Sequence, residues 1–292
     1  MSSRFPTLLL REWMQHKRGW LLTLVLPPAF ILSILPFSHT NGLPDHALAA
    51  GLIVVLGMTL LMLAISAISV GFQLSGLARR DVQDRSIEFW LSLPSSHGES
   101  LAATLLAHVL LVPLAAVVFG FGMGYVMAAA AALKSAGLAG LASIPWAQIT
   151  ALALPAAARL AVGVPLALIW AAPLVMLLMA SAAWLKRWSV AVMVGALLIT
   201  CTILPKVYGI VLVRDWLRDQ TRGAWHALLA NPEAIASSPE QMSNVDSATA
   251  WQWATGDFTN ELHALLSWQL ASGLAIAALG FYLLILRRQR AG

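Results

Sequence analysis

Six stretches of the sequence are apolar for long enough to cross a lipid bilayer as helices. A helix needs about 20 apolar residues to cross about 30 Å of hydrocarbon. The qualifying segments are 19–37, 47–77, 101–133, 160–185, 188–213 and 264–286. Only 11% of the residues are charged, whereas a soluble domain carries about 25%. We therefore expect an all-α, polytopic membrane protein with six transmembrane helices.

The remaining segments are short. We expect 1–18 to be a cytoplasmic helix, 78–100 a cytoplasmic loop and 287–292 a cytoplasmic tail, and the first span reads as uncleaved. Residues 134–159 are rich in Ala, Gly and Pro. We predict short helices at the outer interface there, not a seventh span. Residues 214–263 are too short and too poor in aliphatic residues for an independent domain, so we predict a cap of small outer helices.

The distribution of charge orients the chain. If the N-terminus is cytoplasmic, 12 of the 18 Lys and Arg residues fall on the cytoplasmic side, and the net charge of +5 divides into +7 inside and −2 outside. Cytoplasmic segments of membrane proteins carry an excess of Lys and Arg. This pattern favours six spans with both termini cytoplasmic, in a bacterial plasma or inner membrane. It also explains the basic composition without a nucleic-acid partner.

Several kinds of chemistry lack their usual residues. With the spans bounded as above, none has Asp or Glu in its middle, and only His108 and Lys206 are ionisable there. Ion-coupled transporters usually keep an intramembrane carboxylate. The phosphate-binding motif needs a Gly-Lys pair, which the sequence lacks. We therefore expect no catalytic residue, metal or cofactor in this chain, and an energy source in another subunit.

The N-terminal residues 5–18 have the pattern of an amphipathic helix. The apolar residues Phe5, Leu8, Leu9, Trp13 and Met14 fall on one side, whereas Arg4, Arg11, Glu12, Gln15, Lys17 and Arg18 lie mostly on the other. Such a helix lies at the membrane surface, with its apolar face in the acyl boundary and basic groups such as Arg18 toward headgroups. The alternative is a solvated basic N-terminus.

The loop between spans two and three has a second amphipathic pattern. Charges of alternating sign at 79–85 are followed by Ile87, Trp90, Leu91 and Pro94 at helical spacing. Pro94 would end that helix, and Ser95–Ser96 with Glu99 would start the next one through an arrangement like a capping box. An apolar side chain such as Phe89 or Trp90 could enter a groove of a partner. An ordinary loop packed on the bundle fits the pattern equally well.

This loop also carries a resemblance. Six spans, a basic N-terminal helix and the loop D-R-S-I-E-F-W-L-S-L-P-S-S-H-G-E resemble the permease subunit of type-2 ABC exporters, which export drugs, sodium, polysaccharides and lipids. The family motif is close to E-x-G-T-L-E-x-L-L-x-x-P-[IV]-[ST]-x-x-E. The matching residues are Ile87, Glu88, Leu91, Pro94, Ser95 and Glu99, whereas Arg85-Ser86 replace Gly-Thr and Asp84 only approximates the expected acid.

The resemblance implies a specific assembly. Two permease protomers, either two copies of this chain or a homologous pair, would form a twelve-helix pathway in the lipid. Two ABC ATPase subunits would dock below and bind ATP and Mg. The coupling helix, which contacts the ATPase, would contain Asp84, Arg85, Ile87, Glu88, Phe89, Trp90, Leu91 and Pro94, and residues 5–18 would be the connecting helix. A membrane scaffold that recruits an ATPase without conducting a substrate is the alternative.

Three glycines in the third span could let another helix approach closely. Gly120 and Gly124 are four positions apart, with Gly122 between them, and this spacing of small residues is found where membrane helices pack tightly. The partner helix could belong to the same chain or to a second protomer.

Overall fold

The computed structural model describes residues 5–38, 46–78, 96–185, 188–228 and 245–290. Within these ranges the chain is helical and has no strand. The elements are α1 (Phe5–Ile34), the 3₁₀ turn η1 (Leu35–Phe37), α2 (Ala47–Leu77), α5 (His97–Leu105), the π-helical turn η2 (Leu106–Leu111), α6 (Val112–Ser143), α7 (Trp146–Leu185), α8 (Ser189–Leu198), the π-helical turn η4 (Ile199–Ile203), α9 (Leu204–Tyr208), α10 (Leu212–Leu228), α12 (Ser247–Ala264) and α13 (Trp268–Gln289).

Six helical segments in the described part of the chain are long and apolar enough to cross a membrane. They are Phe5–Phe37, Ala47–Leu77, His97–Ser143, Trp146–Leu185, Ala191–Tyr208 and Trp268–Gln289. The prediction of six membrane-spanning helices is therefore confirmed at the level of length and composition. The chain has the architecture of a multi-pass membrane protein.

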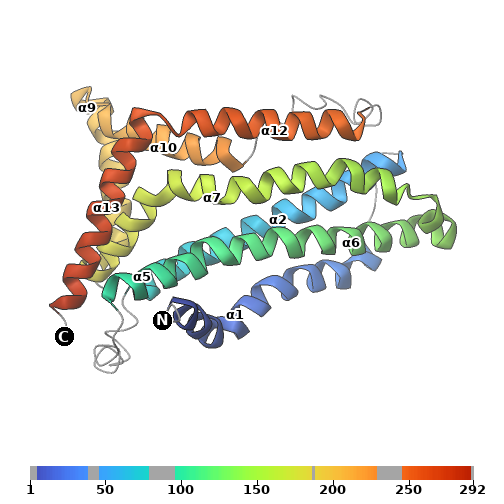
Figure 1. Ribbon diagram of the computed structural model, residues 1–292, viewed down its shortest axis with the longest axis horizontal. Coiled ribbons are helices and arrows are strands. Elements are labelled where there is room, and N and C mark those ends of the chain that lie inside the picture. Colours follow the sequence, from blue (N-terminus) through green and yellow to red (C-terminus); the bar gives the residue numbers. More distant parts are fainter. Residues whose placement is uncertain (1–4, 39–45, 79–95, 186–187, 229–244, 291–292) are drawn as a thin grey trace.

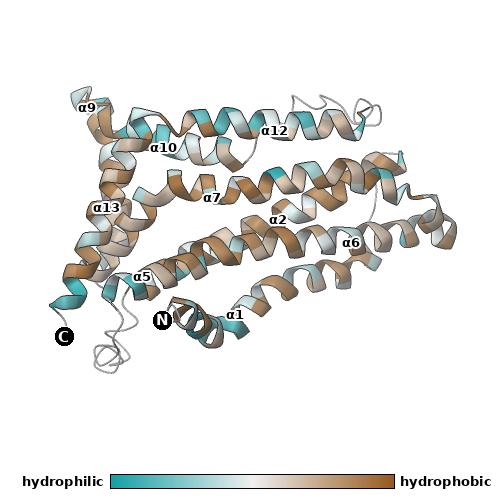
Figure 2. Ribbon diagram, in the orientation of Figure 1, coloured by the Kyte–Doolittle hydropathy of each residue, from teal (hydrophilic) through white to brown (hydrophobic). Residues whose placement is uncertain are grey.

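The centre of the molecule is a bundle of α2, α6 and α7 (Figure 1). Helix α1 lies along one side of this bundle, α10 and α12 pack along α7, and α13 packs against the C-terminal half of α7. Apolar residues dominate α2, α6 and α7, whereas the polar residues gather on α10 and α12 (Figure 2). This distribution suits a bundle in lipid with two more polar helices attached to it.

Two glycines of α6 make the close approach of α2 possible. A Cβ on Gly124 would lie 2.7 Å from the Cα of Val55, and a Cβ on Gly120 would lie 2.9 Å from the Cβ of Met62. Both distances are shorter than real Cβ contacts, so only glycine fits at these positions. Gly122 faces away, with nothing within 4 Å of an added Cβ. The small face of the third span therefore packs inside the chain.

Residues 134–159 follow our prediction of short helices only in part. Ala136 and Gly137 have non-helical backbone angles, with a φ of 61° at Gly137, so 138–143 form a short segment separate from the rest of α6. From Trp146 the chain instead enters the 40-residue helix α7. Alanine is the strongest helix former, and residues 151–159 are rich in it, which favours this continuation into the fourth span. A helix of 40 residues is about 60 Å long, about twice the hydrocarbon thickness. Part of α7 therefore extends beyond the hydrocarbon or tilts within it.

The far end of α1 is held to α6 by a lysine. Lys134 Nζ donates to the Leu35 carbonyl at 2.6 Å and also to the Ser38 carbonyl. These bonds satisfy carbonyls at the end of a helix, where no intrahelical donor follows. Most of α1 between its ends is poorly covered, because only 11% of its most apolar window is buried. Polar contacts at its two ends, together with packing of Ile31 and Leu32 against the apolar cluster between α2 and α6, hold α1 to the bundle.

Candidate functional site

The most unusual feature of the described residues is a buried carboxylate near the start of α1. Glu12 is 0% exposed and the neighbouring Arg11 is 8% exposed, whereas Trp13 and Met14 are 45% and 57% exposed. A buried ion is costly unless charged or hydrogen-bonding groups surround it. Within the described residues, Glu12 contacts side chains of its own helix and of the third span.

This burial corrects our interpretation of residues 5–18. We predicted that Arg11 and Glu12 would face the headgroups with Arg18, and that Trp13 would lie with Leu8 and Leu9 on a face in the acyl boundary of the membrane. Leu8 is buried, Phe5 and Leu9 are half-buried and Arg18 is exposed. Arg11 and Glu12 turn inward because α5 places hydrogen-bonding side chains opposite them. Residues 5–18 also continue into the first span as the single helix α1.

One oxygen of Glu12 is held by two donors. Arg11 Nη2 lies 2.5 Å from Glu12 Oε1, and the Thr104 hydroxyl donates to the same oxygen at 3.1 Å. Arg11 Nη2 also donates to Ser100 Oγ at 3.4 Å. Ser100 and Thr104 are one turn apart on α5, so a single helix face receives both residues of α1. These bonds fix the carboxylate in one orientation.

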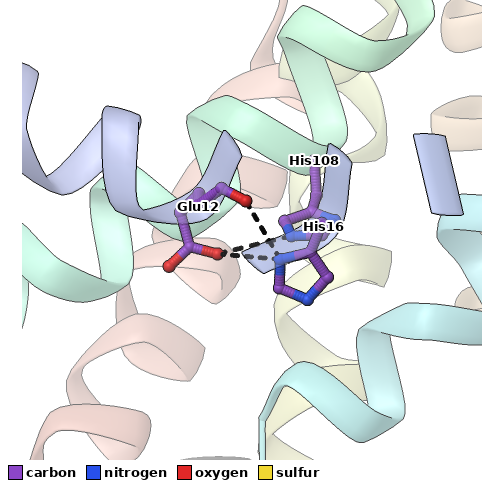
Figure 3. A group of neighbouring side chains, drawn as sticks. All are labelled: Glu12, His16 and His108. Atoms are coloured by element: carbon purple, nitrogen blue, oxygen red, sulfur yellow. Dashed lines mark hydrogen bonds and ion pairs between the residues drawn. The ribbon is translucent and has the colours of Figure 1, made fainter. Parts of the chain in front are cut away.

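The second oxygen of Glu12 faces two histidines. His108 Nε2 lies 3.4 Å from Oε2, and His16 Nδ1 lies 3.6 Å from it (Figure 3). His16 Nδ1 also lies 3.2 Å from the Glu12 backbone carbonyl. The carboxylate oxygen and one nitrogen from each ring all lie within 4.8 Å of one another. Among the described residues, this is the one group with the composition and spacing to hold a metal ion.

His108 lies in an irregular turn of the third span. The turn η2 is π-helical, and Pro113 follows near the start of α6. Proline has no N–H to donate to the preceding turn, which favours a local change of helical pitch. His108 is 0% exposed, and its Nδ1 has no hydrogen-bond partner within the described ranges. Short π-helical turns occur frequently at functional sites.

Aromatic rings pack against the two histidines of the site. The rings of His16 and His108 meet edge to face, with centroids 4.5 Å apart, and the Trp20 ring meets His108 in the same manner at 5.0 Å. Trp20 is itself buried. The two imidazoles are therefore held in place by ring contacts. His108 is fully buried, whereas the His16 side chain is 24% exposed. Burial strengthens electrostatic interactions around His108.

The sequence pointed to only part of this site. His108 stood out as one of two ionisable residues inside the predicted spans. Glu12 and His16, four residues apart on a helix, share one face, but each also fits a polar surface of a membrane-bound helix. We expected no metal site, yet α1 and η2 bring together three side chains that commonly ligate metals.

The predicted partner-binding residues 84–94 lie outside the described residues. Their C-terminal boundary is described, however. Ser96 Oγ accepts from the Glu99 N–H at 3.1 Å, and Glu99 Oε2 accepts from the Ser96 N–H at 3.0 Å. The capping box that we predicted at the start of the third span is therefore confirmed. It begins α5 one turn before Ser100, the serine that contacts Arg11.

A second buried polar group joins α7 to α10 and α12. Arg159 of α7 is 3% exposed, and its Nη2 lies 2.7 Å from Asp257 Oδ2 of α12. Arg159 Nη1 donates to the Ala227 carbonyl of α10 at 2.9 Å. Gln220 of α10 is fully buried and donates to the Gln269 carbonyl of α13 at 2.7 Å. These contacts attach the two polar helices to the bundle.

The chain matches no protein-family model and has no significant match among curated proteins or solved structures. Its function is therefore inferred from its own helices and from the residues that they bring together.

Proposed function

We propose that this chain is the membrane-spanning permease subunit of an ATP-driven exporter of the type-2 ABC class. In this proposal two permease protomers form the substrate pathway, and two separate ATPase subunits bind ATP and Mg and drive it. The six membrane-spanning helices support the proposal, as does the loop motif at residues 84–99.

The observation that carries the proposal is the packing directly after the predicted loop that contains residues 84–94. The start of α5, directly after this loop, contacts α1 near its N-terminus, where Arg11 Nη2 donates to Ser100 Oγ. A Cβ added at Gly98 would lie 3.7 Å from Ile285 Cδ1, near the end of α13. The loop boundary therefore lies beside the first and last described helices (Figure 1). This packing supports one shared face on which an ATPase could contact the loop.

Basic residues on this face agree with a cytoplasmic orientation. The guanidinium carbons of Arg287 and Arg290 each lie 5.9 Å from the centroid of the Trp184 ring. Cation–π contacts of this kind hold arginines beside an aromatic ring at a membrane boundary. The basic residues at the end of α13 therefore lie beside the end of α7, where Trp184 is located.

Two spans have surface available for a second protomer. In the most apolar windows, none of the Ala191–Tyr208 segment and 11% of the Phe5–Phe37 segment is buried, whereas the other four spans are 28–50% buried. The first and fifth spans therefore present most of their side chains to lipid or to another chain. This difference supports a dimer that packs through these spans.

The burial of Glu12 bears on whether a carboxylate could couple transport to an ion gradient. An acid does lie inside the helical bundle, but 23 residues, or about 35 Å of helix, separate it from the Leu35 carbonyl that binds Lys134. That separation is close to the thickness of the hydrocarbon, so Glu12 lies near one boundary. The sequence has no Asp or Glu at 13–44, 46–80, 100–214 or 262–292. A carboxylate relay across the membrane is therefore not available, which favours an ATPase partner.

Purification from native membranes in mild detergent tests the proposal. We expect an ATPase with a phosphate-binding loop to co-purify, and substrate transport by the reconstituted complex to stop when that loop's lysine is replaced. The expected effect of Glu88→Ala or Trp90→Ala is continued ATP hydrolysis with little transport, without loss of the folded spans. Transport by this chain alone without ATP would overturn the proposal. ATPase recruitment without transport of any substrate would instead identify a scaffold.

A further inference from the structure

We infer that Glu12, His16 and His108 form a binding site for one divalent transition-metal ion, with zinc as the best match. The ligand atoms are Glu12 Oε2, His16 Nδ1 and His108 Nε2. The inference is independent of the exporter proposal, because it depends only on contacts between α1 and the third span.

The distances between the ligand atoms suit zinc. Bonds of about 2.0–2.1 Å in a tetrahedral complex separate two ligand atoms by about 3.3–3.4 Å. The two oxygen–nitrogen distances, from Glu12 Oε2 to His108 Nε2 and to His16 Nδ1, are 3.4 and 3.6 Å. Small side-chain movements would bring all three atoms to bonding distance, with His16 Nδ1 giving up its proton and its hydrogen bond to the Glu12 backbone carbonyl. Two imidazoles and one carboxylate are a known zinc ligand set, which leaves a fourth position for water.

The type of ligand excludes the common hard cations. Calcium and magnesium prefer sites made of oxygen atoms, whereas imidazole suits zinc, copper, iron and nickel. Two of the three ligand atoms here are imidazole nitrogens. Thiolates select softer ions, and the single cysteine of the chain, Cys201, lies in the fifth span, away from this site.

The carboxylate is oriented as metal ligands usually are. In metal sites the ligating carboxylate is hydrogen-bonded through surrounding groups, which hold it in place. Here Arg11 and Thr104 occupy Oε1 and leave Oε2 directed at the two rings. The Arg11 guanidinium also lies against Glu12, so its charge partly offsets that of the carboxylate.

His108 supplies the independent evidence for a ligand. It is fully buried in a π-helical turn, and its Nδ1 has no hydrogen-bond partner in the described part of the chain. Its Nε2 lies near Glu12 Oε2 without the geometry of a hydrogen bond. Buried polar groups without such bonds are rare and call for an explanation. Metal coordination would satisfy Nε2 and would join α1 to the third span.

The test uses the full chain in lipid nanodiscs, purified without a histidine tag and stripped of metal with EDTA. Calorimetric titration with Zn²⁺ should show one ion bound per chain. Co²⁺ at the same site should give the visible absorption bands of a tetrahedral complex, which Zn²⁺ should remove by displacement. A wild-type chain that binds no Zn²⁺ and gives no such bands would overturn the inference, and this result requires no variant.

Variants locate the bound ion. His108→Gln and His16→Gln should abolish the Co²⁺ bands, and Thr104→Val should weaken Zn²⁺ binding by about 10- to 100-fold because Oε1 loses a donor. His263→Gln, at an exposed histidine of α12, and Cys201→Ser should bind as the wild type does. Unchanged binding in both His108→Gln and His16→Gln would place the ion elsewhere and overturn the assignment. Size-exclusion profiles verify that each variant is folded.

Discussion

The Arg159 guanidinium of α7 lies 2.7 Å from the Asp257 carboxylate of α12, and the same side chain donates to the end of α10. One arginine therefore attaches both polar helices to the apolar bundle. The Arg159 side chain is 2% exposed and that of Asp257 is 17% exposed, so water offers little replacement for a lost partner.

Removing the carboxylate should weaken this attachment. Asp257→Ala leaves Arg159 buried without its counter-ion, and the loss of one partner of a buried ion pair costs about 3 kcal/mol. The free energy of unfolding, measured by denaturant titration in detergent, should fall by about that amount. Arg159→Met combined with Asp257→Ala should cost less than the sum of the two single changes, because no unpaired charge remains.

The control for this prediction is a more exposed ion pair. The Asp215 side chain is 43% exposed and pairs with Arg214 at 3.0 Å. Pairs of this kind contribute about 0–1 kcal/mol. If Asp257→Ala and Asp215→Ala lower the free energy of unfolding equally, the buried pair between α7 and α12 stabilises the protein no more than an exposed pair does.

The stability of α12 should depend on pH through Glu261. Burial raises the pKa of its carboxyl above the ordinary value of 4.5, and the negative charge of Asp257 raises it further, against opposition from Arg159 and His226. A raised pKa means that the folded state binds the proton more tightly, so ionisation of Glu261 destabilises the fold. This cost is absent below about pH 4.5 and grows as the pH rises through the raised pKa. Glu261→Gln should therefore stabilise the protein at pH 7 but not at pH 4, as thermal unfolding would show.

The N-cap of the same helix provides a contrast. Hydrogen bonds from the Thr249 side chain and backbone lower the pKa of the Asp246 carboxyl below 3.8. The stabilisation of the fold by the ionised Asp246 carboxylate is therefore present at neutral pH and is lost as the pH falls through the lowered pKa. Asp246→Ala should be less stable than the parent at pH 7, with a difference that shrinks in acid. Parallel pH profiles for Asp246→Ala and Glu261→Gln would contradict both assignments.

Two glycines two residues apart should respond differently to the same substitution. Gly124→Ala would place a Cβ 2.7 Å from the Val55 Cα, and such overpacking costs about 1–3 kcal/mol. At the exposed Gly122 an added Cβ meets nothing within 4 Å, so Gly122→Ala should stay within about 0.5 kcal/mol of the parent. Denaturant titration in detergent compares the two. If the effects are equal, α2 and α6 are not in close contact at Gly124.

The single cysteine of the chain tests the proposed dimer without a new substitution. Cys201 is exposed on the fifth span, and Val194 and Leu198 are exposed on the helix that precedes it. If two copies pack through this span, oxidation in native membranes should join a cysteine at one of these positions to its copy. Each position is tested alone, with 194 and 198 in a Cys201→Ser background. A linked dimer on a denaturing gel is the expected result.

The control for the dimer test is a buried position. Met62 of α2 is 0% exposed, so Met62→Cys in the Cys201→Ser background should give no linked dimer. Failure of all three positions on the fifth span to link would contradict a homodimer formed through that span.

The six membrane-spanning segments and the capping box of α5 could be predicted from the sequence. Long apolar segments have few alternatives to transmembrane helices, because lipid offers no partner for backbone polar groups. The capping box of Ser96 and Glu99 was equally predictable, since it depends on residues three positions apart. The glycines of α6 indicated close packing, but only the contact between Gly124 and Val55 identifies the partner helix.

The candidate site could not be predicted because its ligands are far apart in the sequence. Glu12 and His16 belong to the first helix, and His108 belongs to the third span. A helical wheel places Glu12 with the basic residues, where it reads as a surface group. Its burial depends on Ser100 and Thr104 of α5, which the wheel does not include. The length of α7 was not predicted for another reason. Pro155 suggested a break, but the helix continues through it.

The central claim is that an ATPase drives this chain through the loop that contains residues 84–94. The most direct test is photo-crosslinking in native membranes with a benzophenone amino acid in place of Trp90, and with the same substitution at the exposed Trp251 of α12 as the control. The account predicts that position 90, and not position 251, links to a subunit that binds ATP. If position 90 reacts with membrane-impermeant reagents from outside the cell, or links to no ATP-binding protein, the account is contradicted.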